Sequence, residues 1–520
     1  MPQTRDMNPV YPGKDVSYID TKQAQREGEI ALLDGERLAT AAWLAGASYP
    51  IASLDKAWRL LAFGAHHDAI TGTEGDQVYL DLLAGWREAY ERGAAARSDA
   101  VAYLAGLADT AAAAGAEPDP GSVGAPGRPR AVVVFNTLAW PRSGMVTASL
   151  EFAEREAAGL TITDPAGATT GYLADGIARH DDGSLAAATL TFRAADVPPL
   201  GYQTFVVRPV PPRQPDPSGP QAGAPDPAGP EASAWQPASG LMIENDAFTI
   251  RAGQADGGSL ESIVDRRSGT ELLAGAGNEL VIQEEYGTHP RWGEGPWMLC
   301  QKGRWRGPAD RHASVRAERC PVGTRLLTEY NFDELRVTQE TLLWDGADVV
   351  EFRTHVDGSI GHDRLLRVRF ATDVPGGLPV YQTGLSVIGR PFGDAEIDVA
   401  EHTFTMDNPA HEWFGVGSTA RVSLTGQAGE RRLHAIGVAE VIAPADPATD
   451  GFAPRDGGAG CDCRQAVRDL LIALAGQGVT ATCSVPEGPR YGAIELDSNL
   501  PDVRIALGGP EENDFTAQVL

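Results

Sequence analysis

Residues 114–136, AGAEPDPGSVGAPGRPRAVVVFN, mark the point at which the hydrophobic pattern of this chain changes. Before them, from about residue 18 to 113, apolar residues recur at close to 3.6 positions, as in amphipathic helices. After them, short β-branched runs such as AVVVFN are separated by Gly, Pro, Asp and Asn, as in strands joined by turns. The Pro- and Gly-rich residues 114–129 show neither period, so they are expected to be a linker.

The N-terminal part, residues 1–113, is expected to form three helices. Because a helix with one apolar stripe must bury that stripe, three such helices joined by short turns predict a three-helix bundle. The expected stripes are Ala24, Ile30, Leu33, Leu38 and Ala41 in the first helix, Leu54, Ala57, Trp58 and Leu61 in the second, and Val78, Leu82, Trp86 and Tyr90 in the third.

The remainder of the chain has the pattern of β-structure. Residues 130–210 predict a small β-domain, and a second Pro/Gly-rich linker is expected at 211–238. Residues 239–520 contain many short strand-like runs and almost no helical stretch, which predicts a large antiparallel β-sandwich. The expected fold class is therefore α+β, multidomain.

Charge and composition exclude several classes of function. The chain has 43 Lys and Arg against 71 Asp and Glu, a formal net charge of −28, which repels phosphate backbones and anionic lipid. We therefore expect no nucleic acid and no membrane as a partner. Five cysteines in 520 residues are too few for a disulfide framework, and no signal peptide is visible, so a cytoplasmic location is expected.

The string with the most chemical content is GAHHDAITGTEGDQVYLD, residues 64–81. It places His66, His67 and Asp68 near the expected end of the second helix, with His67 on one side and its two neighbours turned away by roughly 100° each. A neutral imidazole is a good zinc ligand, and an adjacent carboxylate can orient it or bind a substrate hydroxyl. The alternative is a solvated helix cap without a metal.

This string, between AWRLL and QVYLDL, resembles the signature of the three-helix middle domain of glycoside hydrolase family 38 α-mannosidases. Other segments agree in the same order along the chain, so that the resemblance covers nearly all of it. They are YPGKDVSYIDTKQAQREGEIALLDGERLA, RAVVVFNTLAWPRSG, IENDAFTIRAGQADGGSLESIVDRRSGTELL, GNELVIQEEYGTHPRWGEGPW, VVEFRTHVDG and FTMDNPAHEWFG. The resemblance implies that the C-terminal sandwich is galactose-mutarotase-like.

The resemblance also implies roles for the three residues. His67 matches a ligand of one zinc ion, Asp68 matches a residue that contacts the sugar, and His66 is then a supporting residue. The family's other zinc ligands are a histidine and an aspartate of an H-x-D string and the nucleophilic aspartate, all in an N-terminal α/β domain. The H-x-D strings of this chain, at 180–182 and 355–357, are expected to be a solvated loop and an ordinary strand. The nucleophile and the general acid are therefore not expected in this chain, which is expected to be partial.

The expected function is zinc-assisted, retaining hydrolysis of terminal α-linked mannose in a mannose-containing oligosaccharide or glycan. The expected protein partner is a separately encoded N-terminal domain or a second copy of the chain. The alternative is a non-catalytic carbohydrate-binding or structural β-sandwich protein that descends from such an enzyme. Two further segments with acidic and aromatic residues, 284–297 and 404–415, are expected to be structural rather than catalytic.

Overall fold

The computed structural model describes residues 12–108, 110, 128–211, 230–288, 290, 299, 301–302, 305–308, 312–372, 374, 378–384, 387–389, 409–417, 421–425, 431–436, 438–444, 463–477, 479–484, 501 and 503–520. The chain forms two compact units, each described here by itself. The larger unit is Tyr18–Ile282 with Trp305–Thr372, and the smaller unit is Met1–Ser17, Gln283–Arg304 and Asp373–Leu520. None of the described helices combines the length and the apolar character needed to cross a membrane.

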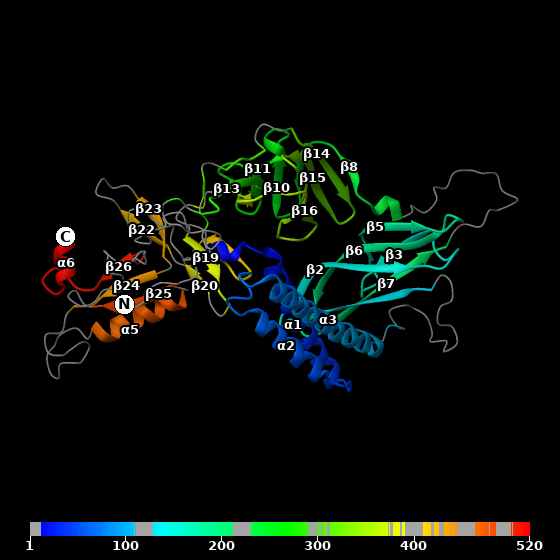
Figure 1. Cartoon of the computed structure of the whole chain (residues 1–520), viewed down its shortest axis with the longest axis horizontal. Helices are drawn as coiled ribbons and strands as arrows, with labels where there is room; N and C mark the ends of the chain where they lie inside the picture. Colours follow the sequence, from blue (N-terminus) through cyan, green and yellow to red (C-terminus); the bar gives the residue numbers. More distant parts are fainter. Residues whose placement is uncertain are drawn as a thin grey trace. The chain divides into compact units, whose positions relative to one another are not determined.

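The larger unit begins with a bundle of three helices, α1 (Ile19–Leu44), α2 (Ile51–Gly64) and α3 (Asp76–Leu107) (Figure 1). Leu32, Leu54, Leu61 and Trp86 form the centre of its core. The expected apolar stripe of α1 is wrong, since Leu38 is the only one of its five residues that is buried. The side of α1 that packs contains glycines and small residues, and its buried residues are Thr21, Gly28, Ala31, Leu32, Gly35, Leu38, Ala39 and Ala42.

A small β-domain follows the bundle. Its two sheets have the strand orders β1-β7-β3-β4 and β2-β6-β5, and all pairs are antiparallel. Phe192 and Phe205, 4.9 Å apart between ring centroids, lie in the core between these sheets. The strands are β1 (Arg130–Phe135), β2 (Arg142–Glu151), β3 (Gly159–Thr163), β4 (Thr169–Thr170), β5 (Tyr172–Arg179), β6 (Leu185–Val197) and β7 (Tyr202–Val210).

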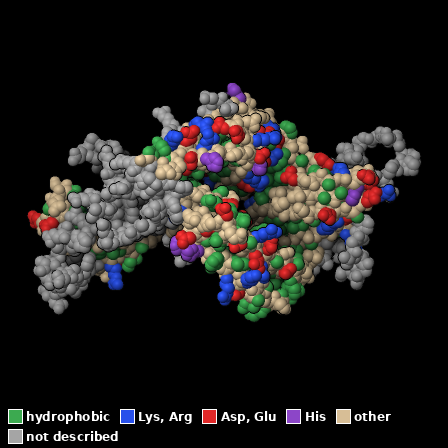
Figure 2. All heavy atoms as spheres, in the orientation of Figure 1, with side chains coloured by type: hydrophobic (Ala, Val, Ile, Leu, Met, Phe, Trp, Pro, Cys, Tyr) green, Lys and Arg blue, Asp and Glu red, His purple; other side chains and the backbone are tan. Residues whose placement is uncertain are grey.

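The rest of the larger unit is an antiparallel sandwich. A five-stranded sheet, β17-β16-β15-β14-β8, and the sheet β12-β11-β10-β9 share one core with the pair β13-β18. Figure 2 shows acidic and basic side chains intermixed on the surface it draws. The strands are β8 (Gln236–Ala238), β9 (Met242–Glu244), β10 (Phe248–Ala252), β11 (Leu260–Asp265), β12 (Thr270–Glu271), β13 (Glu279–Glu284), β14 (Ser314–Cys320), β15 (Gly323–Phe332), β16 (Leu335–Trp344), β17 (Glu351–Asp357) and β18 (Arg364–Arg369).

The smaller unit contains the described strands from β19 on. The pairs within β20-β19-β21 and β22-β23 are antiparallel, whereas β24 pairs in parallel with both β25 and β26. The elements are β19 (Leu378–Gln382), β20 (Val387–Gly389), β21 (Phe414–Gly417), β22 (Arg421–Thr425), β23 (Arg431–Ala435), β24 (Val438–Ile442), α5 (Cys463–Gly476), β25 (Thr480–Ser484), β26 (Val503–Ala506) and α6 (Asp514–Val519).

The α+β multidomain fold class is confirmed: a helical N-terminal part precedes many antiparallel sheets. Within that class, the C-terminal part differs from the expectation of antiparallel strands alone. Helix α5 lies between β24 and β25 in the sequence, and Val467 of α5 shares a buried cluster with Val441 of β24. A helical crossover of this kind is what joins two parallel neighbours in a sheet.

Candidate metal and substrate site

The residues His66, His67 and Asp68 lie in the turn between α2 and α3. Helix α2 ends at Gly64, which packs against the buried ring of Trp86: an added Cβ would lie 2.5 Å from Trp86 Nε1, so this position requires glycine. The three residues lie at the end of the second helix, as expected, but they occupy the turn that follows it, so the expected helical positions of their side chains are wrong. All three side chains are exposed, with exposed fractions of 54%, 82% and 64% in sequence order.

Hydrogen bonds of the threonines in ITGT fix the conformation of this turn. The Thr71 hydroxyl, which is buried, donates to the carbonyl oxygens of His67 at 2.8 Å and of Asp68 at 3.2 Å. The Thr73 hydroxyl donates to the Asp68 carbonyl at 3.2 Å. Because the backbone of His67 and Asp68 is held on the bundle side, their side chains are left to face outward. This is the local reason for the Thr-x-Thr pattern that follows the histidines.

Two contacts with the start of α1 attach the turn to the bundle. The hydroxyl of Thr21, a fully buried residue of α1, donates to the carbonyl oxygen of Ile70 at 3.0 Å. Gly72 has a φ of +76°, and an added Cβ would lie 2.5 Å from the ring of Tyr18, so both the backbone and the space favour glycine there. The exposed side chains thus stand on a turn that tertiary contacts hold in place.

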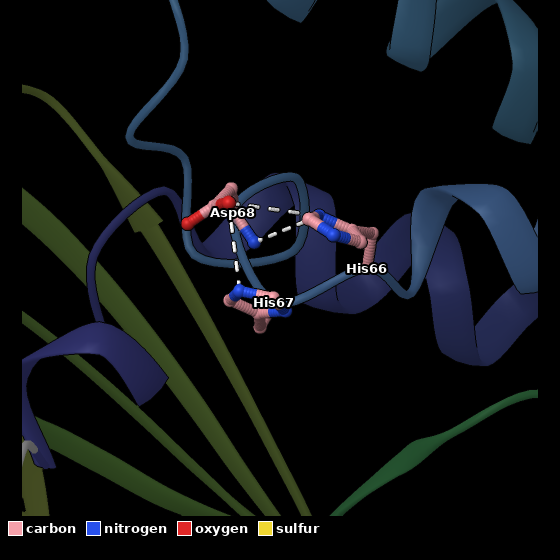
Figure 3. A group of neighbouring side chains, drawn as sticks. All are labelled: His66, His67 and Asp68. Carbon is pink, nitrogen blue, oxygen red and sulfur yellow. Dashed lines mark hydrogen bonds and ion pairs between the residues drawn. The ribbon is translucent and has the colours of Figure 1, made fainter.

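Asp68 lies beside both imidazoles and interacts with each of them (Figure 3). Its Oδ2 is 3.5 Å from Nε2 of His67 and 3.8 Å from Nδ1 of His66. The backbone N–H of Asp68 donates to Nδ1 of His66 at 3.2 Å, and the two rings are 4.2 Å apart between centroids. Since Nδ1 of His66 accepts this hydrogen bond, a neutral His66 carries its proton on Nε2.

The donor set suits a metal ion. The three side chains each offer one ligand atom, and these atoms lie within 4.8 Å of one another. Two ligands of a tetrahedral zinc ion, each about 2.0–2.2 Å from the metal, lie about 3.3–3.5 Å apart. The 3.5 Å between His67 Nε2 and Asp68 Oδ2 agrees with that spacing, and neither atom accepts a hydrogen bond among the described residues. His67 and Asp68 therefore lie close enough to bind one cation together, or to bind a cation through His67 and a ligand hydroxyl beside it through Asp68, with His66 bracing the turn.

A second acidic group lies beside this turn, and the sequence analysis did not identify it. The Tyr79 hydroxyl donates a hydrogen bond to Asp20. This hydrogen bond, together with burial and the negative charges of Asp20 and Glu74, raises the pKa of Tyr79 to about 12. Both carboxylate oxygens of Glu74 are buried and have no hydrogen-bond partner within the described part of the chain. Glu74 belongs to the quoted string 64–81, but its burial depends on tertiary packing, which the string alone does not reveal.

The structure also places the other candidates. His180 and Asp182 lie at a turn, where Nε2 of His180 is 2.9 Å from the carbonyl oxygen of Phe152 and Asp182 accepts two hydrogen bonds from Ser184. His355 is in the middle of β17, opposite Thr338. Both H-x-D strings thus have structural surroundings and lie apart from the cluster of His66, His67 and Asp68.

The two acidic and aromatic segments are described only in part. In the segment 284–297, Glu284, Glu285 and Tyr286 are described, whereas its histidine at 289, its tryptophans at 292 and 297 and its glutamate at 294 lie outside the described residues. In the segment 404–415, the backbone N–H of Glu412 donates to the side-chain oxygen of Gln382 at 2.7 Å. That bond joins the backbone of this segment to β19, and the side chain of Glu412 is exposed.

Two family models match the sequence. Residues 14–104 match the α-mannosidase middle domain, and residues 243–425 match the C-terminal domain of glycosyl hydrolases family 38. No curated protein matches the sequence.

Solved structures with a similar fold include an α-mannosidase from Enterococcus faecalis V583, with a TM-score of 0.53 and 16% identity over 73% of this chain and 46% of that one. A glycosyl hydrolase family 38 protein from Enterococcus faecalis has a TM-score of 0.54 and 17% identity over 73% of this chain and 48% of the other. The chain thus spans about half the length of these proteins.

Proposed function

Because the chain belongs to glycoside hydrolase family 38, whose middle and C-terminal domain models it matches in order, we propose that it contributes to an α-mannosidase. The proposed reaction is hydrolysis of terminal α-linked mannose in an oligosaccharide or glycan. The observation that supports it best is the pair formed by His67 Nε2 and Asp68 Oδ2, 3.5 Å apart and exposed on a turn that the bundle holds in place.

In this proposal His67 is a ligand of one zinc ion, and Asp68 accepts a hydrogen bond from a mannose hydroxyl. The zinc, when bound, polarises and orients the hydroxyl oxygens of the sugar. His66 supports the site through its contact with the backbone N–H of Asp68. The carboxylate oxygens of Asp68 accept hydrogen bonds from hydroxyl groups. Substitution of Asp68 by a residue without such oxygens should therefore weaken binding of the sugar.

Other residues must supply the rest of the chemistry. A retaining glycosidase needs two carboxyl groups about 5–5.5 Å apart, one as nucleophile and one as acid and then base. Among the described residues, the only group that could hold a metal at this turn contains a single carboxylate, that of Asp68. We therefore place the nucleophile, the general acid and the remaining zinc ligands on another domain, separately encoded or covalently joined.

Exposed apolar side chains on the bundle agree with such a partner. Phe63 at the end of α2 is 71% exposed, and Val78 and Leu80 at the start of α3 are 51% and 58% exposed. These residues flank the turn in the sequence on both sides. We take these exposed apolar side chains as part of the surface that the partner covers.

The alternative is a carbohydrate-binding or structural protein without catalysis. It rests on the cluster of His66, His67 and Asp68, which contains one carboxylate, whereas the carboxylate oxygens of the nearby Glu74 are buried. The two hypotheses differ in whether the protein, isolated together with its cellular partners, has α-mannosidase activity.

The test is hydrolysis of 4-nitrophenyl α-mannoside with added zinc, by the purified chain and by the tagged chain isolated from its source cells with its partners. We expect no useful turnover by the chain alone and clear turnover by the cellular preparation. That turnover should be lost in the Asp68→Ala variant and kept in a Asp181→Ala control, a change at an exposed aspartate on the β5–β6 turn. Absence of activity from the cellular preparation, or activity that survives Asp68→Ala, would contradict the proposal.

A further inference from the structure

A cavity of about 530 Å³ lies in the larger unit between the small β-domain and the sandwich. One wall is the sheet β2-β6-β5, and the other is formed by β15, β16 and β17. We call it the interdomain cavity. Its volume lies within the range of about 300–1,000 Å³ that is typical of small-ligand sites.

Direct contacts fix the two walls relative to each other at one end. Leu173 of β5 shares a buried cluster with Val322, Leu342 and Trp344 of the sandwich. The Arg193 guanidinium of β6 donates to the carbonyl oxygen of Gly346 at 3.1 Å. The cavity is therefore a feature of a packed interface, with an apolar floor formed by the same cluster.

The sandwich wall presents charged groups that are held in place. The Arg325 guanidinium contacts Glu318 at 2.6 Å, also pairs with Glu340, and lies 4.6 Å over the ring of Trp235. The next pair along the wall is Arg353 with Glu351, at 2.6 Å. Since every guanidinium of this wall is matched by carboxylates, the wall carries no excess of positive charge to attract an anion.

The opposite wall presents threonine hydroxyls, paired with neighbouring hydroxyls but able to form one further hydrogen bond each, and a carboxylate. Thr147 and Thr191 are cross-strand neighbours whose hydroxyls are 3.0 Å apart, and Thr189 lies two residues along the same face of β6. Asp175, opposite Thr189 on β5, lines the cavity and is exposed, and its carboxylate has no hydrogen bond or ion pair to any described residue. Its carboxylate offers about four acceptor sites to a ligand.

We propose that the interdomain cavity is a second binding site, for a neutral saccharide. A sugar presents hydroxyls that both donate and accept, together with an apolar C–H face. The threonine hydroxyls and Asp175 suit those hydroxyls, and the floor of Leu173, Leu342 and Trp344 suits the apolar face. The unpaired negative charge of Asp175 disfavours phosphorylated and other anionic ligands. This inference does not depend on the roles proposed for His67 and Asp68.

The test is calorimetric titration of the whole chain with neutral trisaccharides, mannotriose and maltotriose, at millimolar concentration. We expect binding of at least one of them. Asp175→Asn should weaken it about tenfold, because a hydrogen bond to a charged group is replaced by a weaker one. Thr191→Val should weaken it several-fold. The matched controls, Asp181→Asn and Thr161→Val, change exposed residues of the same domain outside the cavity and should leave binding unchanged.

His67→Ala separates this site from the one on the bundle. Trisaccharide binding that survives His67→Ala but is weakened by Asp175→Asn supports the second site. Binding that is lost in His67→Ala and unchanged in Asp175→Asn overturns it, as does the absence of any binding by the unaltered chain. Circular dichroism of each variant checks that its fold is kept, and Thr191→Val provides a second test if Asp175→Asn does not fold.

Discussion

Substitution of Gly93 by alanine should loosen the helix bundle that carries the candidate site. Gly93 of α3 faces α1, and an added Cβ would lie 2.8 Å from the carbonyl carbon of Ala31 and 2.8 Å from the backbone nitrogen of Leu32. Backbone atoms cannot rotate away as a flexible side chain can, so the two helices must separate.

The sign of the effect follows from two opposing contributions. Alanine is favoured over glycine within a helix by about 1 kcal/mol. Overpacking of a tight interface costs typically about 1–3 kcal/mol, and contact with backbone belongs at the upper end of that range. We therefore expect a net destabilisation of about 1–2 kcal/mol for Gly93→Ala. Gly85→Ala, in the same helix, is the matched control, since its Cβ would meet only Leu60 Cδ2 at 3.6 Å.

The assay is amide hydrogen exchange in α1 and α3, which reports local opening in a chain too large for a single two-state unfolding transition. Gly93→Ala should accelerate exchange by roughly 5- to 30-fold, the factor that corresponds to 1–2 kcal/mol. Gly85→Ala should slow it or leave it unchanged. Equal protection in the two variants would refute the close approach of α1 and α3 at Gly93.

Two further predictions concern single hydrogen-bonding groups. Thr71→Val keeps the side-chain shape but removes the hydroxyl that donates to the carbonyl oxygens of His67 and Asp68. Amide hydrogen exchange at Ala69 and Ile70 should therefore accelerate. Unchanged exchange would show that the hydroxyl does not hold the turn. Burial raises the pKa of Glu271, but hydrogen bonds from the Ser262 hydroxyl and from backbone N–H groups outweigh it and lower the pKa overall. Its stabilisation is therefore present above the ordinary glutamate pKa and is lost as the pH falls, so Glu271→Gln should reduce the acid sensitivity of the sandwich in thermal unfolding at pH 6 against pH 3. The same loss of stability with acid in the variant would contradict this.

The sequence predicted the order of helical and strand regions because hydrophobic period is a local property. It failed to predict which side of α1 is buried. Gly28 and Gly35 lie in the contact with the other helices, and glycine adds nothing to an apolar stripe, so the pattern pointed to Ile30, which is 50% exposed. Where helices pack through small residues, the packing depends on how closely the two backbones approach. The spacing of apolar residues in the sequence does not indicate that distance.

The C-terminal part shows two other limits. The helical spacing of Val467, Leu470, Leu471 and Leu474 in α5 was present in the sequence and was missed among strand-like neighbours. The parallel pairing of β24 with β25 and β26 was not available locally, because a strand's own pattern does not specify the direction of its partner.

For the candidate site, the residue types in HHDAITGT indicated the chemistry, but not the conformation. The donors lie in the turn that follows Gly64, and the packing of Gly64 on Trp86 is a contact between residues 22 positions apart. The burial of the Glu74 carboxylate, which has no hydrogen-bond partner among the described residues, likewise depends on tertiary packing. The metal and substrate roles of His67 and Asp68 remain predictions.

The most direct test of those roles is a titration of the whole chain with Zn²⁺, compared with its His67→Ala and His66→Ala variants. A catalytic zinc site generally has three protein ligands, so we expect weak binding by the unaltered chain, with the ion removed by dialysis. Binding should be abolished in His67→Ala and should persist, somewhat weakened, in His66→Ala, since Nδ1 of His66 is engaged by the backbone N–H of Asp68. Zinc binding that is unchanged in His67→Ala, or lost only in His66→Ala, would contradict the assignment of His67 as the ligand.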